Sequence, residues 1–260
     1  MNILTPNFYA YRSPAFGTNS RIYENPIQDV QAGTTNIYTT TYLLRGDLDF
    51  KKVVDYAKEK SKNKSQINVA CLAGSDGSEA YSYGLCFLNQ FSQGELKKLR
   101  PIISLDRDAE ITKAGQSGKI NLSKGDIKYA KELSKGKDYF VSPDKCIDIK
   151  NNRMGVGALN NSYKPISELK NLVQFEQGNL LDYLKNYKSD EDTLSIINCR
   201  NVMPYLHPID ISDIAYYADK NLKKDDLFVI GSYDKDNTEI EKYLDFYNFE
   251  KIMPNVYRRY

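Results

Sequence analysis

Short apolar runs and amphipathic segments alternate along most of the chain. The apolar runs, which are typical of buried strands, are "INVACLAG" (67–74), "PIISLD" (101–106), "LVQFEQGNL" (172–180), "TLSIINC" (193–199) and "DLFVIGSY" (226–233). Helical segments follow most of them: "EAYSYGLCFLNQF" (79–91), "AEITKAG" (109–115), "DISDIAYYADKNL" (210–222) and "IEKYLDFYNF" (240–249). Repeated strand-to-helix units predict an α/β fold with a mostly parallel sheet and helices on both faces. A last stretch, "KIMPNVYRR" (251–259), is expected to add an edge strand.

A further helix is predicted before the first of these strands. In "DFKKVVDYAKEK" (49–60), the residues Phe50, Val53, Val54 and Ala57 recur at the spacing of one helical face. Asp49 stands where its side chain is able to cap the start of this helix.

Two regions depart from this alternation. Residues 1–36 are rich in Asn, Tyr, Pro, Thr and Gly without a sustained period, so we expect an extended N-terminal arm. Residues 37–260 then form one domain. Within it the pattern loosens into a polar helix, "KGDIKYAKELSKGKDYF" (124–140), and a small inserted subdomain at about 140–170.

The composition excludes several classes of protein. The chain has 260 residues, of which 41% are hydrophobic, so it can bury a substantial core. Its 36 basic and 34 acidic residues nearly cancel, and no dense basic run points to nucleic acid as a partner. No segment reaches the ~20 apolar residues of a membrane span, so no membrane insertion is expected. The cysteines lie far apart, which indicates reduced thiols and a cytoplasmic location.

Polar residues gather where the predicted strands end. Gly74 and Gly77 follow the first strand, Asp106 ends the second, Asn179 follows the third, and Arg200 with Asn201 follows the fourth. Ligands of open parallel sheets bind beyond these strand ends, so we expect a ligand site there. The glycine turn lets backbone approach a ligand, although glycines serve equally well simply to close a tight turn. Asp106 suits the hydroxyls of a ribose or, alternatively, caps the helix that starts near Asp108.

Hydrolytic and metal chemistry fit the sequence poorly. The only histidine, His207, precedes a proline beyond a strand end, and we expect it to have a surface or loop role. The chain has no G-x-S-x-G turn and no close cysteine pair, so neither a nucleophile with its base nor a metal site is expected.

Several motifs, taken in order, resemble those of one family. They are "TYLLRGDLDF", "GSDGSEAYS", "SLDRD", "QGNLLD" and "CRNVMPYL". Together they resemble the CheR family of chemotaxis-receptor glutamate methyltransferases, which bind S-adenosylmethionine. The last motif is the most specific, because the family writes "CRNVMIYF" and this chain differs only at Pro204 and Leu206. The resemblance implies a class I methyltransferase fold, a Rossmann-like, mostly parallel seven-stranded sheet. The family usually has an N-terminal helical domain, whereas the residues before Thr39 have little helical character.

The resemblance also implies site residues. Those expected to bind the cofactor, including the turn glycine, are Thr39, Thr41, Arg45, Gly74, Glu79, Asp106, Asn179, Leu180, Arg200 and Asn201. Asp106 matches the ribose-binding Asp of "TDID", and Asn179 with Leu180 matches the pair that flanks the adenine. Arg45, from the family's "NLTAFFR", and Tyr205 are expected to be catalytic. The Asn of "NLTAFFR" falls on Thr39, and the first Glu of "STGEEPYS" falls on Ser78.

The implied reaction is methyl transfer to a carboxylate, with a glutamate of a chemoreceptor or another protein as the expected acceptor. A glutamate of pKa ~4.3 is ionised at neutral pH and attacks a sulfonium methyl without a general base. Arg45 would grip one edge of that carboxylate, and Tyr205 would donate to it. Two alternatives stay open: a methyltransferase that acts on a small molecule or another side chain, and a non-catalytic module that keeps the fold.

Overall fold

The structure is a computed structural model that describes residues 41–142 and 161–260. A seven-stranded sheet forms the centre of the molecule. Its strand order is β6-β2-β1-β7-β8-β10-β9. The bounds are β1 Gln66–Leu72, β2 Ile102–Asp106, β6 Val173–Gln177, β7 Thr193–Cys199, β8 Leu227–Val229, β9 Phe249–Met253 and β10 Val256–Arg259. The pairs from β6 to β8 are parallel, and only β10 runs antiparallel to its neighbours. The predicted mostly parallel sheet is therefore confirmed.

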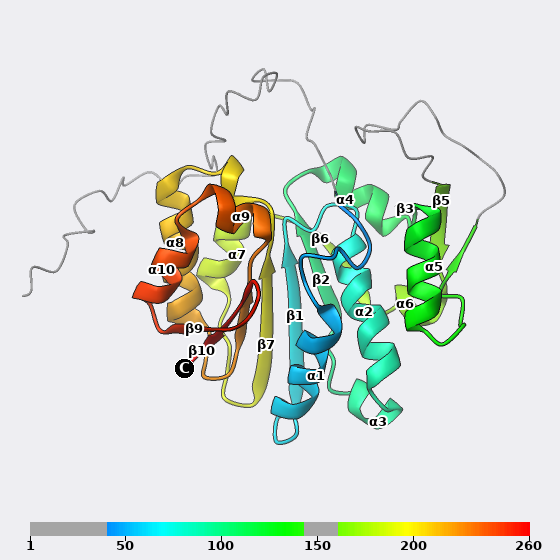
Figure 1. Ribbon diagram of the computed structural model, residues 1–260, viewed down its shortest axis with the longest axis horizontal. Helices are drawn as coiled ribbons and strands as arrows, with labels where there is room; N and C mark the ends of the chain where they lie inside the picture. The colour runs from blue at the N-terminus through cyan, green and yellow to red at the C-terminus, as the bar shows by residue number, and fades with distance from the viewer. Residues whose placement is uncertain (1–40, 143–160) are drawn as a thin grey trace, which may run out of the picture.

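Helices cover both faces of this sheet (Figure 1). One face carries α1 (Phe50–Lys60), α2 (Ser78–Gln90) and α4 (Ala109–Gln116), and α3 (Gln93–Leu96) follows α2. The other face carries α7 (Leu180–Asn186), α8 (Pro208–Asn221) and α10 (Ile240–Phe246). Each face has its own buried cluster of apolar side chains. Such a two-sided core explains why β7 is buried along its whole length.

The first helix has the cap that its sequence predicts. Asp49 accepts a hydrogen bond from the Lys52 N–H at 3.0 Å, and Phe50, Val53, Val54 and Ala57 are all buried. Its apolar face packs toward α2, where the rings of Phe50 and Tyr83 meet edge to face at 4.9 Å. The segment just before α1 is thereby fixed beside the strand ends.

A smaller, three-stranded sheet lies at one side of the molecule. It comprises β3 (Ile120–Leu122), β5 (Asn161–Pro165) and β4 (Phe140–Val141), in that order, with α5 (Lys124–Leu133) and α6 (Ser167–Lys170) beside it. The sheet therefore draws on β3, which precedes the inserted subdomain expected at 140–170. Most of that expected insertion, and the whole of the expected 1–36 arm, lie outside the described residues.

The carboxyl-terminal part holds more elements than the sequence predicts. The stretch expected to add one edge strand forms most of a hairpin, in which β9 is the edge strand and β10 lies between β9 and β8. The turn is at Pro254 and Asn255, and Asn255 adopts a left-handed conformation with φ of 63°. Helix α9 (Ser232–Asn237) was not predicted, because "SYDKDN" is polar and has no apolar period.

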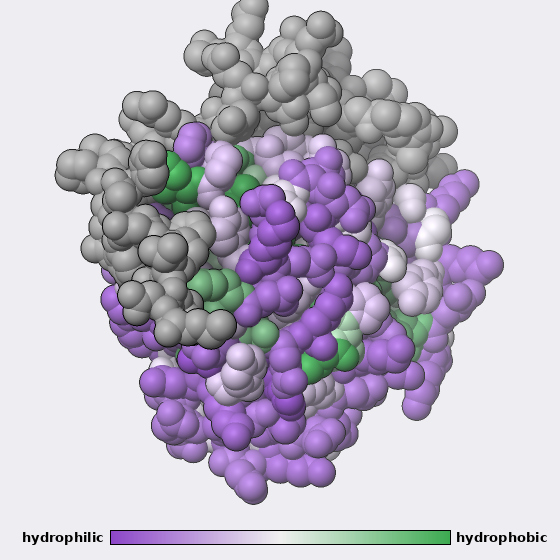
Figure 2. Space-filling model, turned by 60° about the vertical axis from the view of Figure 1, so that its left-hand side comes forward, coloured by the Kyte–Doolittle hydropathy of each residue, from purple (hydrophilic) through white to green (hydrophobic). Residues whose placement is uncertain are grey.

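The surface over α8 and α10 is mostly hydrophilic, with apolar residues in small groups (Figure 2). This matches an amphipathic α8, whose Ile211, Ile214, Ala215 and Ala218 are buried against the sheet. Among the residues that the structure describes, no helix is both long and apolar enough to cross a bilayer.

Candidate functional site

The strand register brings the predicted site residues to one edge of the sheet. Leu72 of β1 pairs with Leu105 of β2 and with Cys199 of β7, while Asp106 pairs with Gln177 of β6. The residues that follow these pairs therefore leave the sheet side by side. They are the glycine turn after β1, Asp106 itself, the Gly178–Asn179 segment and the Arg200–Asn201 pair.

The turn after β1 has an unusual backbone. Ala73, Ser75 and Gly77 all have positive φ, at 60°, 51° and 86°. Two of these are not glycine, so the turn stores strain of the kind that is found at binding sites. Gly74 meets a different demand, because a Cβ there would lie 2.4 Å from the Ser104 Oγ. The Gly74 N–H also donates to the Leu105 carbonyl at 2.8 Å, which ties the turn to β2.

Asp106 faces this turn. Its carboxylate accepts one hydrogen bond from the Ser75 N–H and one from the Asp108 N–H, both at 3.0 Å. Burial raises its pKa, against the effect of these two donors. The cap of α4 is Asp108, which accepts from the N–H groups of Glu110 and Ile111. Asp106 is thus not the helix cap, and its oxygens keep lone pairs for a ligand.

Arg200 lies within a cluster of charges on the α1 and α2 side. Its side chain is fully buried, and its guanidinium pairs with the carboxylates of both Glu79 and Asp47. It also lies over the Phe50 ring, 5.3 Å from the centroid. Burial raises the pKa of Glu79, although Arg200 opposes the shift. The Arg200 Nε is also buried and has no hydrogen-bond partner among the described residues.

Asp47 links this cluster to Arg45. Its Oδ1 lies 3.5 Å from the Arg45 Nε, and its Oδ2 accepts from the N–H and the hydroxyl of Ser232 at 3.1 and 3.2 Å. Burial opposes ionisation of Asp47, yet Arg200, the Ser232 N–H and Arg45 together lower its pKa. One carboxylate thus joins the segment before α1, the end of β7 and the start of α9.

Tyr205 stands at the mouth of the site, in the short 3-10 helix η3 (Met203–Tyr205), with 41% of its surface exposed. Its ring lies 6.2 Å from that of Tyr233 on α9. Burial and Tyr233 raise the pKa of the Tyr205 hydroxyl, while the charge of Arg45 lowers it. Arg45 and Tyr205, the two residues expected to be catalytic, thus lie on segments that Asp47 and α9 join at the same side of the sheet.

The loop that carries Tyr205 is held by Asp234. This buried carboxylate accepts from the N–H groups of Asn201, Val202 and Met203, and from that of Gly231 at 2.7 Å. Burial raises its pKa to about 6, against these four donors. Sequence reasoning missed Asp234 and Asp47. The available signal for Asp234 was an acidic residue directly after the apolar run 226–233. The available signal for Asp47 was its place in "RGD", two residues after Arg45.

Asn201 has a left-handed backbone, with φ of 56°, and packs against Gly231. A Cβ at Gly231 would lie 2.3 Å from the Asn201 Oδ1, so only glycine fits there. This Oδ1 is buried and has no hydrogen-bond partner within residues 41–142 and 161–260. A buried acceptor of this kind is open to a ligand donor.

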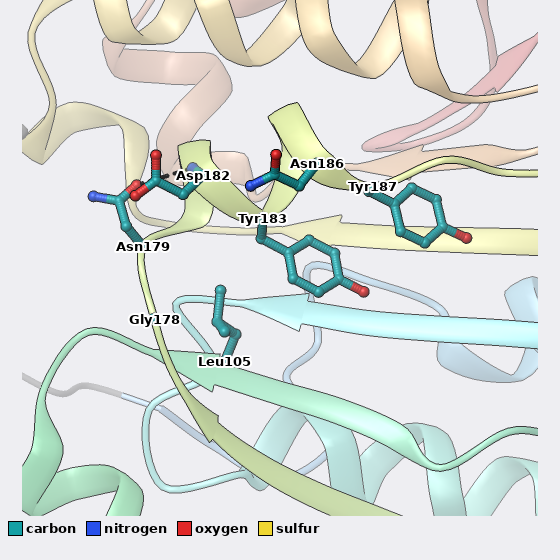
Figure 3. Close-up of a pocket in the computed structure, with 7 residues that line it drawn as sticks. All are labelled: Leu105, Gly178, Asn179, Asp182, Tyr183, Asn186 and Tyr187. Atoms are coloured by element: carbon teal, nitrogen blue, oxygen red, sulfur yellow. Dashed lines mark hydrogen bonds between the residues drawn. The ribbon is translucent and has the colours of Figure 1, made fainter. Parts of the chain in front are cut away.

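The other end of the site is a pocket beside α7 with a volume of about 480 Å³ (Figure 3). Its lining residues are Leu105, Gly178, Asn179, Asp182, Tyr183, Asn186 and Tyr187. Asn179 caps α7, since its Oδ1 accepts from the Leu181 N–H at 2.8 Å, and Leu180 begins the helix. Figure 3 shows Leu105 and Tyr183 pointing into the space between the strands and α7.

Three further residues that the sequence analysis considered are Thr39, Thr41 and His207. Thr41 is half-buried in the segment before α1, and Thr39 lies outside the described residues. His207 caps α8 through its Nδ1, which accepts from the Ile209 N–H at 3.2 Å. In the described part of the chain, no group of three His, Cys, Asp or Glu residues is arranged to hold a metal ion.

Comparisons with known proteins identify the family of the chain. Residues 39–251 match the model of the CheR methyltransferase, SAM binding domain. None of the curated proteins matches the chain. Among solved structures, an S-adenosylmethionine-dependent methyltransferase from Clostridium acetobutylicum ATCC 824 is 13% identical, with a TM-score of 0.33 over 72% of this chain. The match covers 52% of that protein, so the chain spans about half its length. The family model alone covers most of the chain, and the chain therefore belongs to the CheR methyltransferase family, through its S-adenosylmethionine-binding domain.

Proposed function

We propose that this protein transfers a methyl group from S-adenosylmethionine to a carboxylate, namely a glutamate side chain of a chemoreceptor-like protein in the cytoplasm. The observation that carries the proposal is that Asp47 contacts both Arg45 and Ser232, and that the ring of Tyr233, the residue after Ser232, lies 6.2 Å from that of Tyr205. A guanidinium and a phenol are both hydrogen-bond donors, and together they suit an anionic acceptor.

The described residues fit the cofactor. Asp106 presents carboxylate lone pairs for the ribose hydroxyls. Asn179 lines the α7 pocket, where the adenine would lie, and Leu180 follows it as the first residue of α7. Near the glycine turn, Asp76 Oδ2 and Ser75 Oγ are buried and have no hydrogen-bond partner among the described residues, as is also true of the Asn201 Oδ1. These acceptors suit the ammonium and amino groups of the cofactor. We propose that Arg200 acts indirectly, by holding Glu79 in place.

The bound cofactor supplies a methyl group made electrophilic by a sulfonium. A carboxylate oxygen of the acceptor forms a bond to the methyl carbon while the methyl–sulfur bond breaks, and the electron pair remains on sulfur. No proton moves in this step, so the site needs no general base. The task of the protein is to hold the acceptor in line, with Arg45 on one edge of the carboxylate and Tyr205 donating to it.

The chemistry at the mouth argues against an amine or hydroxyl acceptor. An amine must first lose a proton, and the positive charge of Arg45 would repel its ammonium form. A hydroxyl needs a base, and the only histidine of the chain is engaged as the cap of α8. A carboxylate meets neither obstacle.

The test is the chemical stability of the product. The protein is incubated with cofactor labelled in the methyl group and with a cell extract, and the labelled fraction is then treated with mild alkali. Methyl esters release labelled methanol under these conditions, whereas methylated amines and ethers keep their label. Label that survives the alkali would refute a carboxylate acceptor. No labelled product at all, together with intact binding of S-adenosylhomocysteine, would favour the non-catalytic module.

A further inference from the structure

Tyr233 is a second phenol at the mouth of the site, and none of the motifs assigns it a role. It lies on α9, its ring centroid is 6.2 Å from that of Tyr205, and the two ring planes meet at 44°. The two rings therefore lie side by side at the exposed end of the site. Tyr233 is half-buried and belongs to neither apolar cluster.

The position of Tyr233 is set by the residues on either side of it. Ser232 is bound through its N–H and hydroxyl to Asp47, the same carboxylate that contacts Arg45. Asp234 is bound to the backbone of the loop that carries Tyr205. Asp47 and Asp234 thus fix α9 to Arg45 and to the loop that carries Tyr205. Such fixation of a side chain through its neighbours is what a preorganised site requires.

A pair of phenols next to a guanidinium has a particular use. When one hydroxyl donates to the other, the second proton of the pair is still free to point outward. An ionised carboxylate accepts at two oxygens and has about four lone-pair positions, so it takes donors from Arg45 and from both tyrosines. We propose that Tyr233 binds the acceptor carboxylate together with Arg45 and Tyr205. This inference rests on the proposed function, since it concerns the same acceptor.

The variant that tests it is Tyr233→Phe, which removes one hydroxyl and keeps the ring. The matched control is Tyr217→Phe on α8, where the ring of Tyr217 contacts Tyr216 and not the site. Hydrogen bonds to charged groups are worth ~1.5–3 kcal/mol, so loss of one lowers acceptor binding roughly ten- to a hundredfold. The readout is the initial rate of alkali-labile labelling in serial dilutions of the extract, with S-adenosylhomocysteine affinity and melting temperature measured in parallel.

We expect Tyr233→Phe to lose about tenfold or more of the rate in dilute extract and to recover part of it in concentrated extract. Its affinity for S-adenosylhomocysteine and its melting temperature should match those of Tyr217→Phe. A full rate in dilute extract would overturn the inference alone. A parallel fall in cofactor affinity and melting temperature would also overturn it, because Tyr233 would then be structural. Alkali-stable label with the wild-type protein would instead overturn the proposed function.

Discussion

The two ends of the site are built from different chemistry. The charged end, defined as Arg45, Asp47, Glu79 and Arg200, consists of ions that pair with one another. The tyrosine end, defined as the α7 pocket with Tyr183 and Tyr187, has two stacked rings whose centroids are 5.7 Å apart. Both ends use residues that leave the same edge of the same sheet. They differ in how their polar groups are satisfied.

At the tyrosine end, polar groups are bound to the fold itself. Asn179 caps α7, and the Tyr187 hydroxyl accepts from the Asn68 amide at 2.7 Å and contacts Ser195 at the same distance. What remains for a ligand is ring surface, the side chain of Leu105 and the exposed side chains of Asp182 and Asn186. The charged end instead holds its charges through other charges, so it can fix an ionic group. A planar group with few hydrogen-bonding atoms therefore fits the tyrosine end, and charged groups fit the charged end.

The strongest way to break the charged end is to remove Arg200. Arg200→Ala leaves Glu79 and Asp47 without the cation between them, and loss of one partner from a buried ion pair costs about 3–5 kcal/mol. We expect the free energy of unfolding in urea to fall by that amount. Arg107→Ala, at an exposed position, serves as the control and should change it by less than about 0.5 kcal/mol. Equal losses in the two variants would refute the assignment of the pair as structural.

Two carboxylates of this region should respond to pH in opposite directions. The pKa of Asp234 is raised from 3.8 to about 6, so between these values the folded state holds a proton that the unfolded state has lost. The free energy of unfolding should then fall as the pH rises from 4 to 6, by up to about 3 kcal/mol at ~1.4 kcal/mol per unit. The pKa of Asp47 is lowered from 3.8, so Asp47 adds to the free energy of unfolding above this value. That stabilisation is lost as the pH falls through the lowered pKa.

Urea unfolding from pH 3 to 7.5 separates the two. Asp234→Asn should make the downward slope between pH 4 and 6 shallower but not remove it, because burial also raises the pKa of Asp76 and of Asp226 to about 6. A constant loss from weaker hydrogen bonds to the loop would add to this change. Asp47→Asn should leave that slope in place and flatten the curve only at the acid end. If both variants kept the slope of the wild-type protein, another group would be responsible for it.

Between the two ends, Asp106 should act on affinity. Asp106→Ala removes an acceptor for the ribose and should weaken S-adenosylhomocysteine binding roughly ten- to a hundredfold, measured by calorimetry. Asp108→Ala is the matched control, because it removes a carboxylate two residues away that caps α4. The control should lower stability by about 1 kcal/mol and leave affinity nearly unchanged. If Asp108→Ala lost affinity and Asp106→Ala lost only stability, Asp108 and not Asp106 would bind the ribose.

The sequence predicted the elements whose signals are local. The apolar runs gave β1, β2, β6, β7 and β8, and helical spacing with a capping residue gave α1. The ordered motifs predicted that Arg45 and Tyr205 belong to one site. These predictions did not require knowledge of contacts between distant segments.

The sequence did not predict what depends on such contacts. Asp47 is important because it meets Arg200, 153 residues away, and Ser232, 185 residues away. The "RGD" segment marks Asp47 as an acidic residue beside Arg45, but it does not record either of these contacts. The polar α9 is likewise fixed from outside itself, by Asp234 and the loop after β7, so its own residues show no period. The C-terminal hairpin was missed because Asn255 at its turn reads as one more residue of an extended run.

The smallest expected effect lies at the tyrosine end and sharpens the comparison. If the tyrosine hydroxyls there stabilise the fold, Tyr187→Phe should lower the free energy of unfolding and leave cofactor affinity unchanged. The change leaves the Asn68 amide without its acceptor in a buried position, which costs about 1 kcal/mol in unfolding free energy. Affinity for S-adenosylhomocysteine should stay within about twofold, since the ring surface is unchanged and ~1.4 kcal/mol would be needed for a tenfold loss.

Tyr183→Phe, on the neighbouring ring of the pair, is the matched control and should change stability less, because the Asn68 amide keeps its bond to Tyr187. A large loss of affinity in Tyr187→Phe with unchanged stability would mean that this hydroxyl faces the ligand, and the contrast between the two ends would then fail.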